Sequence, residues 1–107
     1  MRLSENEKQA IIKAVSDLIG NTQASLYLYG SRVDDKLKGG DIDLILVMHD
    51  DNMAQRFALK NHQFSASIKK LIGNRKIDFS VKSKSAASSD AFWLFVLQNA
   101  VLLHAWS

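Results

Sequence analysis

Residues 28–48, LYGSRVDDKLKGGDIDLILVM, decide the fold of this chain. The β-favouring residues of 24–29 predict a short strand that ends where Gly30 and Ser31 break the pattern. The polar, glycine-containing stretch 33–40 predicts a loop. Residues 41–48 predict a second strand, and its continuously apolar second half is typical of a central strand covered on both faces.

The flanking sequence predicts helices around these strands. A capping box of Ser4 and Glu7 begins a first helix that ends at Gly20. The cap at 50–52 begins a second helix that ends at Gly73, and residues 76–81, KIDFSV, alternate as a strand does. A third helix over 91–98, capped by residues 88–90, precedes a short last strand over 101–104. We therefore expect an α/β (α+β) fold, a small mixed β-sheet with helices packed against it, and one domain over residues 1–107.

Composition excludes several classes of protein. The chain has 107 residues and no cysteine, which rules out thiolate catalysis, disulfides and cysteine-ligated zinc. The net charge of +3 is weaker than a nucleic-acid-binding footprint, so nucleic acid is not indicated, although a polyanionic nucleotide would be tolerated. No apolar run reaches the ~18 residues of a membrane span, and no signal peptide is evident, so we expect no membrane association and a cytoplasmic location.

Acidic residues occur where buried strands are expected. Asp41 and Asp43 are two residues apart on one predicted strand, so their side chains share a face. Asp78 lies within the next predicted strand, which would run about 4.8 Å away if the two strands pair. Three carboxylates this close repel one another unless a cation lies between them. Mg²⁺ favours carboxylate oxygens together with substrate phosphates, and a pair of such ions can clamp a nucleotidyl displacement.

Gly30 and Ser31 form the second part of the candidate site. Glycine allows the backbone to approach a ligand closely, and turn amides bind phosphate. Arg32 follows with a guanidinium that can also bind phosphate.

Taken together, these motifs resemble the DNA polymerase beta nucleotidyltransferase superfamily. LYGS, a spacer slightly shorter than in many members, DIDLILV and KIDFSV match its signature, and the length is similar to that of the minimal nucleotidyltransferases found in HEPN/MNT toxin–antitoxin pairs. The resemblance implies a polymerase beta-like fold in which Asp41, Asp43 and Asp78 are catalytic and hold two Mg²⁺ ions. It also implies that Gly30 and Ser31 bind the triphosphate of ATP or another nucleoside triphosphate, with Arg32 near a phosphate.

The expected function is Mg²⁺-dependent transfer of a nucleoside monophosphate, AMP from ATP by resemblance, to an acceptor hydroxyl. By the same resemblance, the acceptor is on a partner such as a HEPN-domain toxin, for which the chain acts as the antitoxin. Two alternatives stay open, a non-catalytic module that binds a nucleotide or a partner, and a subunit of an antibiotic nucleotidyltransferase. The apolar C-terminal run, including Phe92, Trp93, Phe95 and Trp106, is either a helix packed on the sheet or in part a surface for a partner or for self-association.

Overall fold

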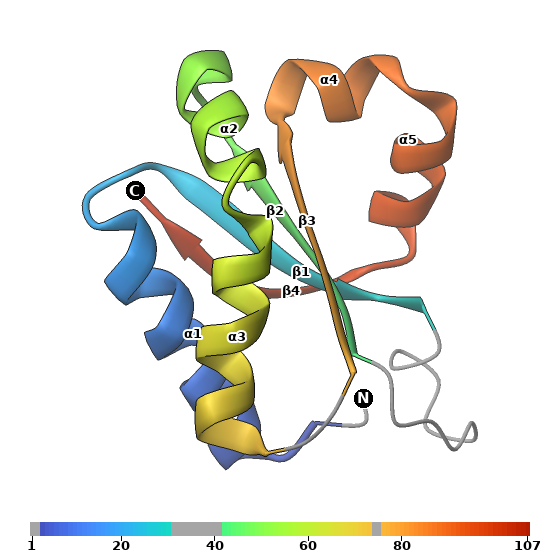
Figure 1. Ribbon diagram of the computed structural model, residues 1–107. Helices are drawn as coiled ribbons and strands as arrows, with labels where there is room; N and C mark the ends of the chain where they lie inside the picture. Colours follow the sequence, from blue (N-terminus) through green and yellow to red (C-terminus); the bar gives the residue numbers. More distant parts are fainter. Residues whose placement is uncertain (1–2, 31–41, 74–75) are drawn as a thin grey trace.

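The computed structural model describes residues 3–30, 42–73 and 76–107. Its elements in chain order are α1 (Glu5–Ile19), β1 (Ala24–Tyr29), β2 (Ile42–Met48), α2 (Asp51–Ala58), α3 (Asn61–Ile72), β3 (Ile77–Ser83), α4 (Lys84–Ser89), α5 (Ala91–Gln98) and β4 (Val101–Trp106). This is the expected combination of a small sheet with helices on its faces (Figure 1).

The four strands form one mixed sheet in the order β3-β2-β1-β4. β1 pairs antiparallel with both β2 and β4, whereas β2 pairs parallel with β3. The apolar strand β2 is therefore interior to the sheet, as its sequence indicated, and all of its residues except Asp43 are buried. β3 and β4 are the two edges of the sheet.

The main core lies between the sheet and the helices α1, α2 and α3. Alternate residues of β1 and β3 point into it, including Leu26, Leu28 and Phe79, and Phe64 of α3 stacks on Phe79 with ring centroids 4.5 Å apart. The helices α4 and α5 lie at the opposite face (Figure 1). The other face of the sheet carries the polar residues that alternate with the core residues on β1 and β3, together with the buried Ile45 and Val47 of β2.

The ends of several elements follow the signals in the sequence. α1 begins with the predicted capping box, in which the Ser4 Oγ accepts from the Glu7 amide at 3.1 Å. α5 begins at Asp90, whose carboxylate accepts from the Phe92 amide at 2.9 Å.

The predicted elements differ from the structure in three respects. The helix expected from 50–52 to Gly73 is two helices, α2 and α3, separated at Leu59 and Lys60, where the Lys60 ψ of 19° departs from helical geometry. The chain bends there so that Ala54 and Phe64 both reach the core. The short helix α4 was not expected, and β3 and β4 are each two residues longer at their C-terminal ends than predicted.

Candidate functional site

A row of polar side chains crosses the three strands β1, β2 and β3 near one end of the sheet. Tyr29 of β1 lies opposite Asp43 of β2, and Asp43 lies beside Asp78 of β3. Residues directly paired across strands project from the same face, and neighbouring strands are about 4.8 Å apart. The pairing therefore puts the two carboxylates side by side on the face of the sheet opposite to the main core.

The local sequence explains why these acids are not buried in the core. On β3, Ile77, Phe79 and Val81 are buried, whereas Asp78 is exposed and Ser80 is half-buried. On β2, Asp43 is half-buried between the fully buried Ile42 and Leu44. Each acid is thus held in a strand whose position is set by its apolar neighbours.

Gly30 closes one side of the carboxylate pair. Its φ of 76° lies in the left-handed region, and a Cβ built on it would be 2.5 Å from the Asp43 Oδ2. Only glycine fits such a position without strain. The missing side chain therefore allows the backbone at Gly30 to lie directly against the Asp43 carboxylate.

The pKa of the Tyr29 phenol is affected by the charges on this face. Burial raises the pKa of the Tyr29 phenol, and the negative charges of Asp43 and, less strongly, Asp78 raise it further. The Ser80 hydroxyl donates a hydrogen bond to the phenolic oxygen, which opposes this rise in pKa. The same face carries Trp93 of α5, whose ring meets the Tyr29 ring edge to face at 5.8 Å.

The residues predicted for the site divide into two groups. Gly30, Asp43 and Asp78 lie together in the structure. Asp41, Ser31 and Arg32 lie outside the described residues, as does the predicted loop over 33–40. Within the described ranges no group of three or more acidic, histidine or cysteine side chains could hold a metal ion, so the described part of the site is a carboxylate pair.

The described pair fits a divalent cation. Two carboxylates on adjacent strands provide the hard oxygen ligands that Mg²⁺ takes. When bound there, Mg²⁺ would neutralise the charge on phosphate oxygens.

Sequence reasoning did not identify Tyr29, Ser80 and Trp93 as neighbours of the acids. Ser80 was detectable in principle, because it shares the alternation of Asp78 along β3. The approach of Trp93 depends on how α5 lies on the sheet, and no local signal in the sequence encodes that.

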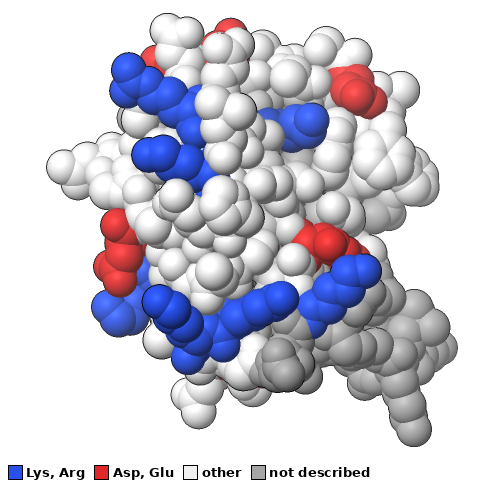
Figure 2. All heavy atoms as spheres, viewed as in Figure 1, with Lys and Arg blue, Asp and Glu red and all other residues white. Residues whose placement is uncertain are grey.

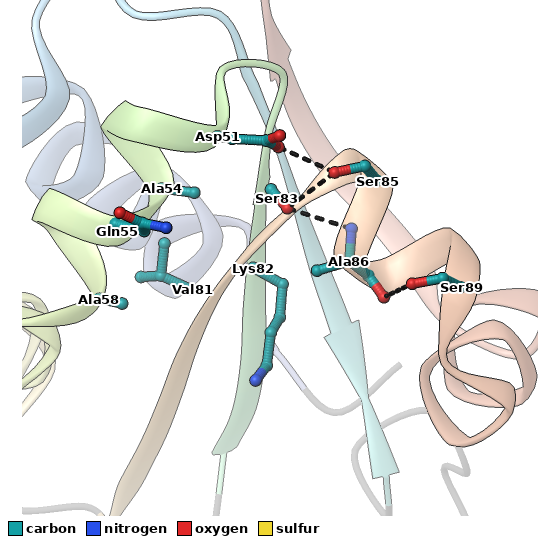
Figure 3. A pocket seen from close by; sticks show the side chains of 10 residues that line it. All are labelled: Asp51, Ala54, Gln55, Ala58, Val81, Lys82, Ser83, Ser85, Ala86 and Ser89. Atoms are coloured by element: carbon teal, nitrogen blue, oxygen red, sulfur yellow. Dashed lines mark hydrogen bonds between the residues drawn. The ribbon is translucent and has the colours of Figure 1, made fainter.

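A separate pocket of about 540 Å³ lies at the β3 edge between α2 and α4 (Figure 3). Small side chains such as Ala54 and Ala86 line it, and the Ser85 Oγ donates to the Asp51 Oδ1 at 2.8 Å across it. It surrounds the C-terminal end of β3, whereas Asp78 is near the start of that strand, so it is distinct from the carboxylate pair.

No helix within the described residues is long and apolar enough to cross a bilayer.

A comparison with curated protein sequences found no match. Residues 8–96, which include Gly30, Asp43 and Asp78 and every strand but β4, match the family model described as the nucleotidyltransferase domain. A domain of this kind catalyses nucleotidyl transfer, and the paired acids beside Gly30 are the candidate site for that reaction in this fold. The chain belongs to the nucleotidyltransferase domain family, within the polymerase beta-like superfamily.

Proposed function

We propose that this chain transfers AMP from Mg²⁺-ATP to a hydroxyl group on a partner protein. The observation that carries the proposal is that Asp43 and Asp78 are paired in register on adjacent strands. The backbone of Gly30 lies directly against Asp43, because glycine has no side chain. A binding module has no need of two adjacent like charges on one sheet face, because their repulsion destabilises the fold unless a cation or a substrate uses them.

In the proposed reaction the acceptor oxygen forms a bond to the α-phosphorus of ATP. The bond from that phosphorus to its bridging oxygen breaks, and pyrophosphate leaves. Asp78, the more exposed of the two described acids, takes the proton of the acceptor hydroxyl. Asp43 and Asp41, with Asp78 completing one metal site, would hold the Mg²⁺ that accompanies the triphosphate. Gly30 and Ser31 would bind the triphosphate tail, with Arg32 near a phosphate.

The acceptor side of the proposal is supported by α5. Its side chains Phe92 and Phe95 are 61% and 68% exposed, although a helix of this composition is normally covered. The same helix contacts the site through Trp93 and Tyr29. A protein that covers α5 would therefore be positioned close to the carboxylate pair. By the resemblance to HEPN/MNT pairs, we propose a HEPN-domain toxin as that partner and an antitoxin role for this chain.

The experiment is labelling with ATP that carries a radioactive α-phosphate. The purified chain is incubated with labelled ATP and Mg²⁺, alone and with the product of the neighbouring gene, and the proteins are separated and counted. We expect label on the partner, and none when the metal is removed by EDTA. Retained nucleotide binding without transfer under either condition would favour the binding module, and label on an aminoglycoside would favour the antibiotic-modifying alternative.

Substitution of the two acids tests their separate roles. Asp43→Asn should lower transfer by about 10²-fold or more, because the charge that holds the cation is lost. Asp78→Asn should slow turnover more than it weakens nucleotide binding, because it removes the proton acceptor. The matched control is Asp17→Asn on α1, an exposed acid paired with Lys13 at 3.3 Å, which should transfer at the wild-type rate. Wild-type turnover in Asp43→Asn would contradict the assignment.

A further inference from the structure

The face of the sheet that carries the two acids also carries a cation that the proposed mechanism leaves unused. Lys82 follows Asp78 and Ser80 at two-residue intervals along β3, so these side chains share a face. Among the described residues no carboxylate forms an ion pair with Lys82. Its charge is therefore available to a ligand on that face.

Within the described part of the chain, the Lys82 ammonium contacts an aromatic ring and no acid. Its Nζ lies 5.8 Å from the centroid of the Trp93 ring, within the range of a cation–π contact. The same ring lies 5.8 Å from the ring of Tyr29, which is paired with Asp43 in the sheet. Trp93 thus links the ammonium to the row of side chains that includes the carboxylate pair.

The direction of the side chain agrees with this placement. Lys82 is itself one of the residues that line the pocket between α2 and α4, and Figure 3 shows its side chain pointing away from Ser83, Ser85 and Asp51 at the upper end of that pocket. The Cα of Lys82 is four residues from that of Asp78, about 13 Å along a strand. Because Trp93 contacts both Lys82 and Tyr29, the ammonium shares the α5 side of the sheet with the acids.

We propose that Lys82 is a phosphate-binding residue for the nucleoside triphosphate, with Trp93 as the residue that positions its ammonium. This inference rests on the proposed function. The two acids make the described site negative, whereas the substrate is a polyanion, so a cation on the same face lowers the repulsion that the substrate meets. Lysine acts on phosphate as a point charge, and the indole face holds that charge while leaving its hydrogen-bond donors unused.

The test measures nucleotide binding directly, without turnover. Trp93 serves as the fluorescent reporter in a Trp106→Phe background, since Trp93 and Trp106 are the only tryptophans in the sequence. The ligands are the non-hydrolysable α,β-methylene analogues of ATP and GTP with Mg²⁺, together with adenosine and guanosine, which have no phosphate. Thermal unfolding of each variant is recorded first.

Lys82→Gln should bind the triphosphate analogues about ten- to a hundredfold more weakly, as expected for the loss of a hydrogen bond between charged groups. Its affinity for the nucleosides should be unchanged, and Lys82→Arg should restore most of the loss. The matched control is Lys69→Gln, which removes the same charge from an exposed position on α3, across the sheet, and should bind like the wild type.

The outcomes separate this inference from the proposed function. Equal triphosphate affinity in Lys82→Gln and wild type would overturn the role of Lys82 while leaving nucleotidyl transfer intact. An equal loss for triphosphate and nucleoside would also overturn it, because the residue would then act on the structure or on the nucleoside. A wild-type chain that binds no Mg²⁺-nucleotide would overturn both.

Discussion

Because Gly30 has a hydrogen atom in place of a Cβ, the backbone at the end of β1 can lie close to the Asp43 carboxylate. Gly20 and Gly30 both have positive φ, 62° and 76°, but a Cβ at Gly20 would meet nothing within 4 Å. Replacing either glycine by a residue with a Cβ therefore strains the backbone. Only at Gly30 would the new Cβ also collide with an acid of the site, Asp43. This difference makes them a matched pair.

Gly30→Ala should lose both stability and transfer, whereas Gly20→Ala should lose stability alone. Each substitution places alanine in the left-handed region, at a cost of about 1–2 kcal/mol. The new Cβ at residue 30 also displaces the Asp43 carboxylate, so transfer should fall about tenfold or more, as expected when a reacting group is displaced. Denaturant unfolding and the labelling assay measure the two effects. Full transfer by Gly30→Ala would show that the approach to Asp43 is not needed.

The raised pKa of Tyr29 makes the free energy of unfolding depend on pH in the alkaline range. Because its pKa is raised in the folded state, chiefly by burial and then by Asp43, the folded protein keeps the phenolic proton at a pH where the unfolded chain has lost it. The resulting stabilisation is fully present below the ordinary tyrosine pKa of about 10 and is lost as pH rises through the raised value.

Tyr29→Phe should therefore flatten the fall in stability above about pH 10. The free energy of unfolding is measured for wild type and variant at several pH values from neutral to strongly alkaline. Tyr27→Phe is the control, since that residue is the neighbouring tyrosine on the same strand face. Parallel curves for wild type and Tyr29→Phe would contradict the role given to this phenol.

At the scale of elements, α3 determines where β3 lies and hence where Asp78 lies. The rings of Phe64 and Phe79 stack with an interplanar angle of 3°, and Phe79 is next to Asp78 in the chain. On the open edge of β3, the Ser65 Oγ donates to the Ile77 carbonyl at 3.4 Å and the Asn61 Nδ2 donates to the Phe79 carbonyl at 3.3 Å. These contacts on both sides of Asp78 hold the strand that presents it.

Phe64→Ala should destabilise the protein by about 3–5 kcal/mol, because it leaves a cavity between α3 and β3. Phe92→Ala on α5 is the same substitution at a side chain that is 61% exposed, compared with 1% for Phe64, and should stay within about 0.5 kcal/mol of wild type. Denaturant unfolding compares the two variants. Similar losses in both would mean that α5 is packed more tightly than its exposure indicates.

At the scale of the whole molecule, the basic side chains around α2 and α3 and the exposed apolar side chains of α5 lie on opposite sides of the sheet. Every charged residue between Asp51 and Asp78 in the sequence is a lysine or arginine, and Figure 2 shows such side chains spread over the face that includes α2 and α3. The exposed apolar side chains of α5 and Leu102 of β4 follow later in the chain, and α4 and α5 lie on the opposite side of the sheet in Figure 1. An apolar partner surface would therefore be on the α5 side.

Without a partner, we expect this α5 surface to pair two copies of the chain. Phe95→Ser should shift the sedimentation coefficient towards that of the monomer at concentrations where the wild type is associated, because it removes an aromatic side chain that is 68% exposed. Leu59→Ser, at an isolated position 82% exposed on the α2 side, is the control and should leave association unchanged. A wild type that sediments as a monomer throughout would exclude self-association by this surface.

The sequence by itself determined the strands and the two described acids on them. The apolar run of β2, the alternation of β3 and the caps at Ser4 and Asp90 are local signals, because side-chain periodicity and backbone capping act over a few residues. They were enough to predict a small sheet with helices and to select Asp43, Asp78 and Gly30. The helix α4 also has a local signal, the N-cap Ser83, whose Oγ accepts from the Ala86 amide at 3.1 Å, but it was not recognised. The start of α3 after Leu59 and Lys60 has no side-chain cap, so the break there had no comparable signal.

Only the tertiary structure decided which strands are neighbours and what stands around the acids. The parallel pairing of β2 with β3 sets Asp78 beside Asp43, although 35 residues separate them in the sequence. The packing of α5 brings Trp93 to Tyr29 and to Lys82. Such contacts form between segments distant in the chain, and their geometry follows from the packing of the whole core, so no pattern within one segment encodes them.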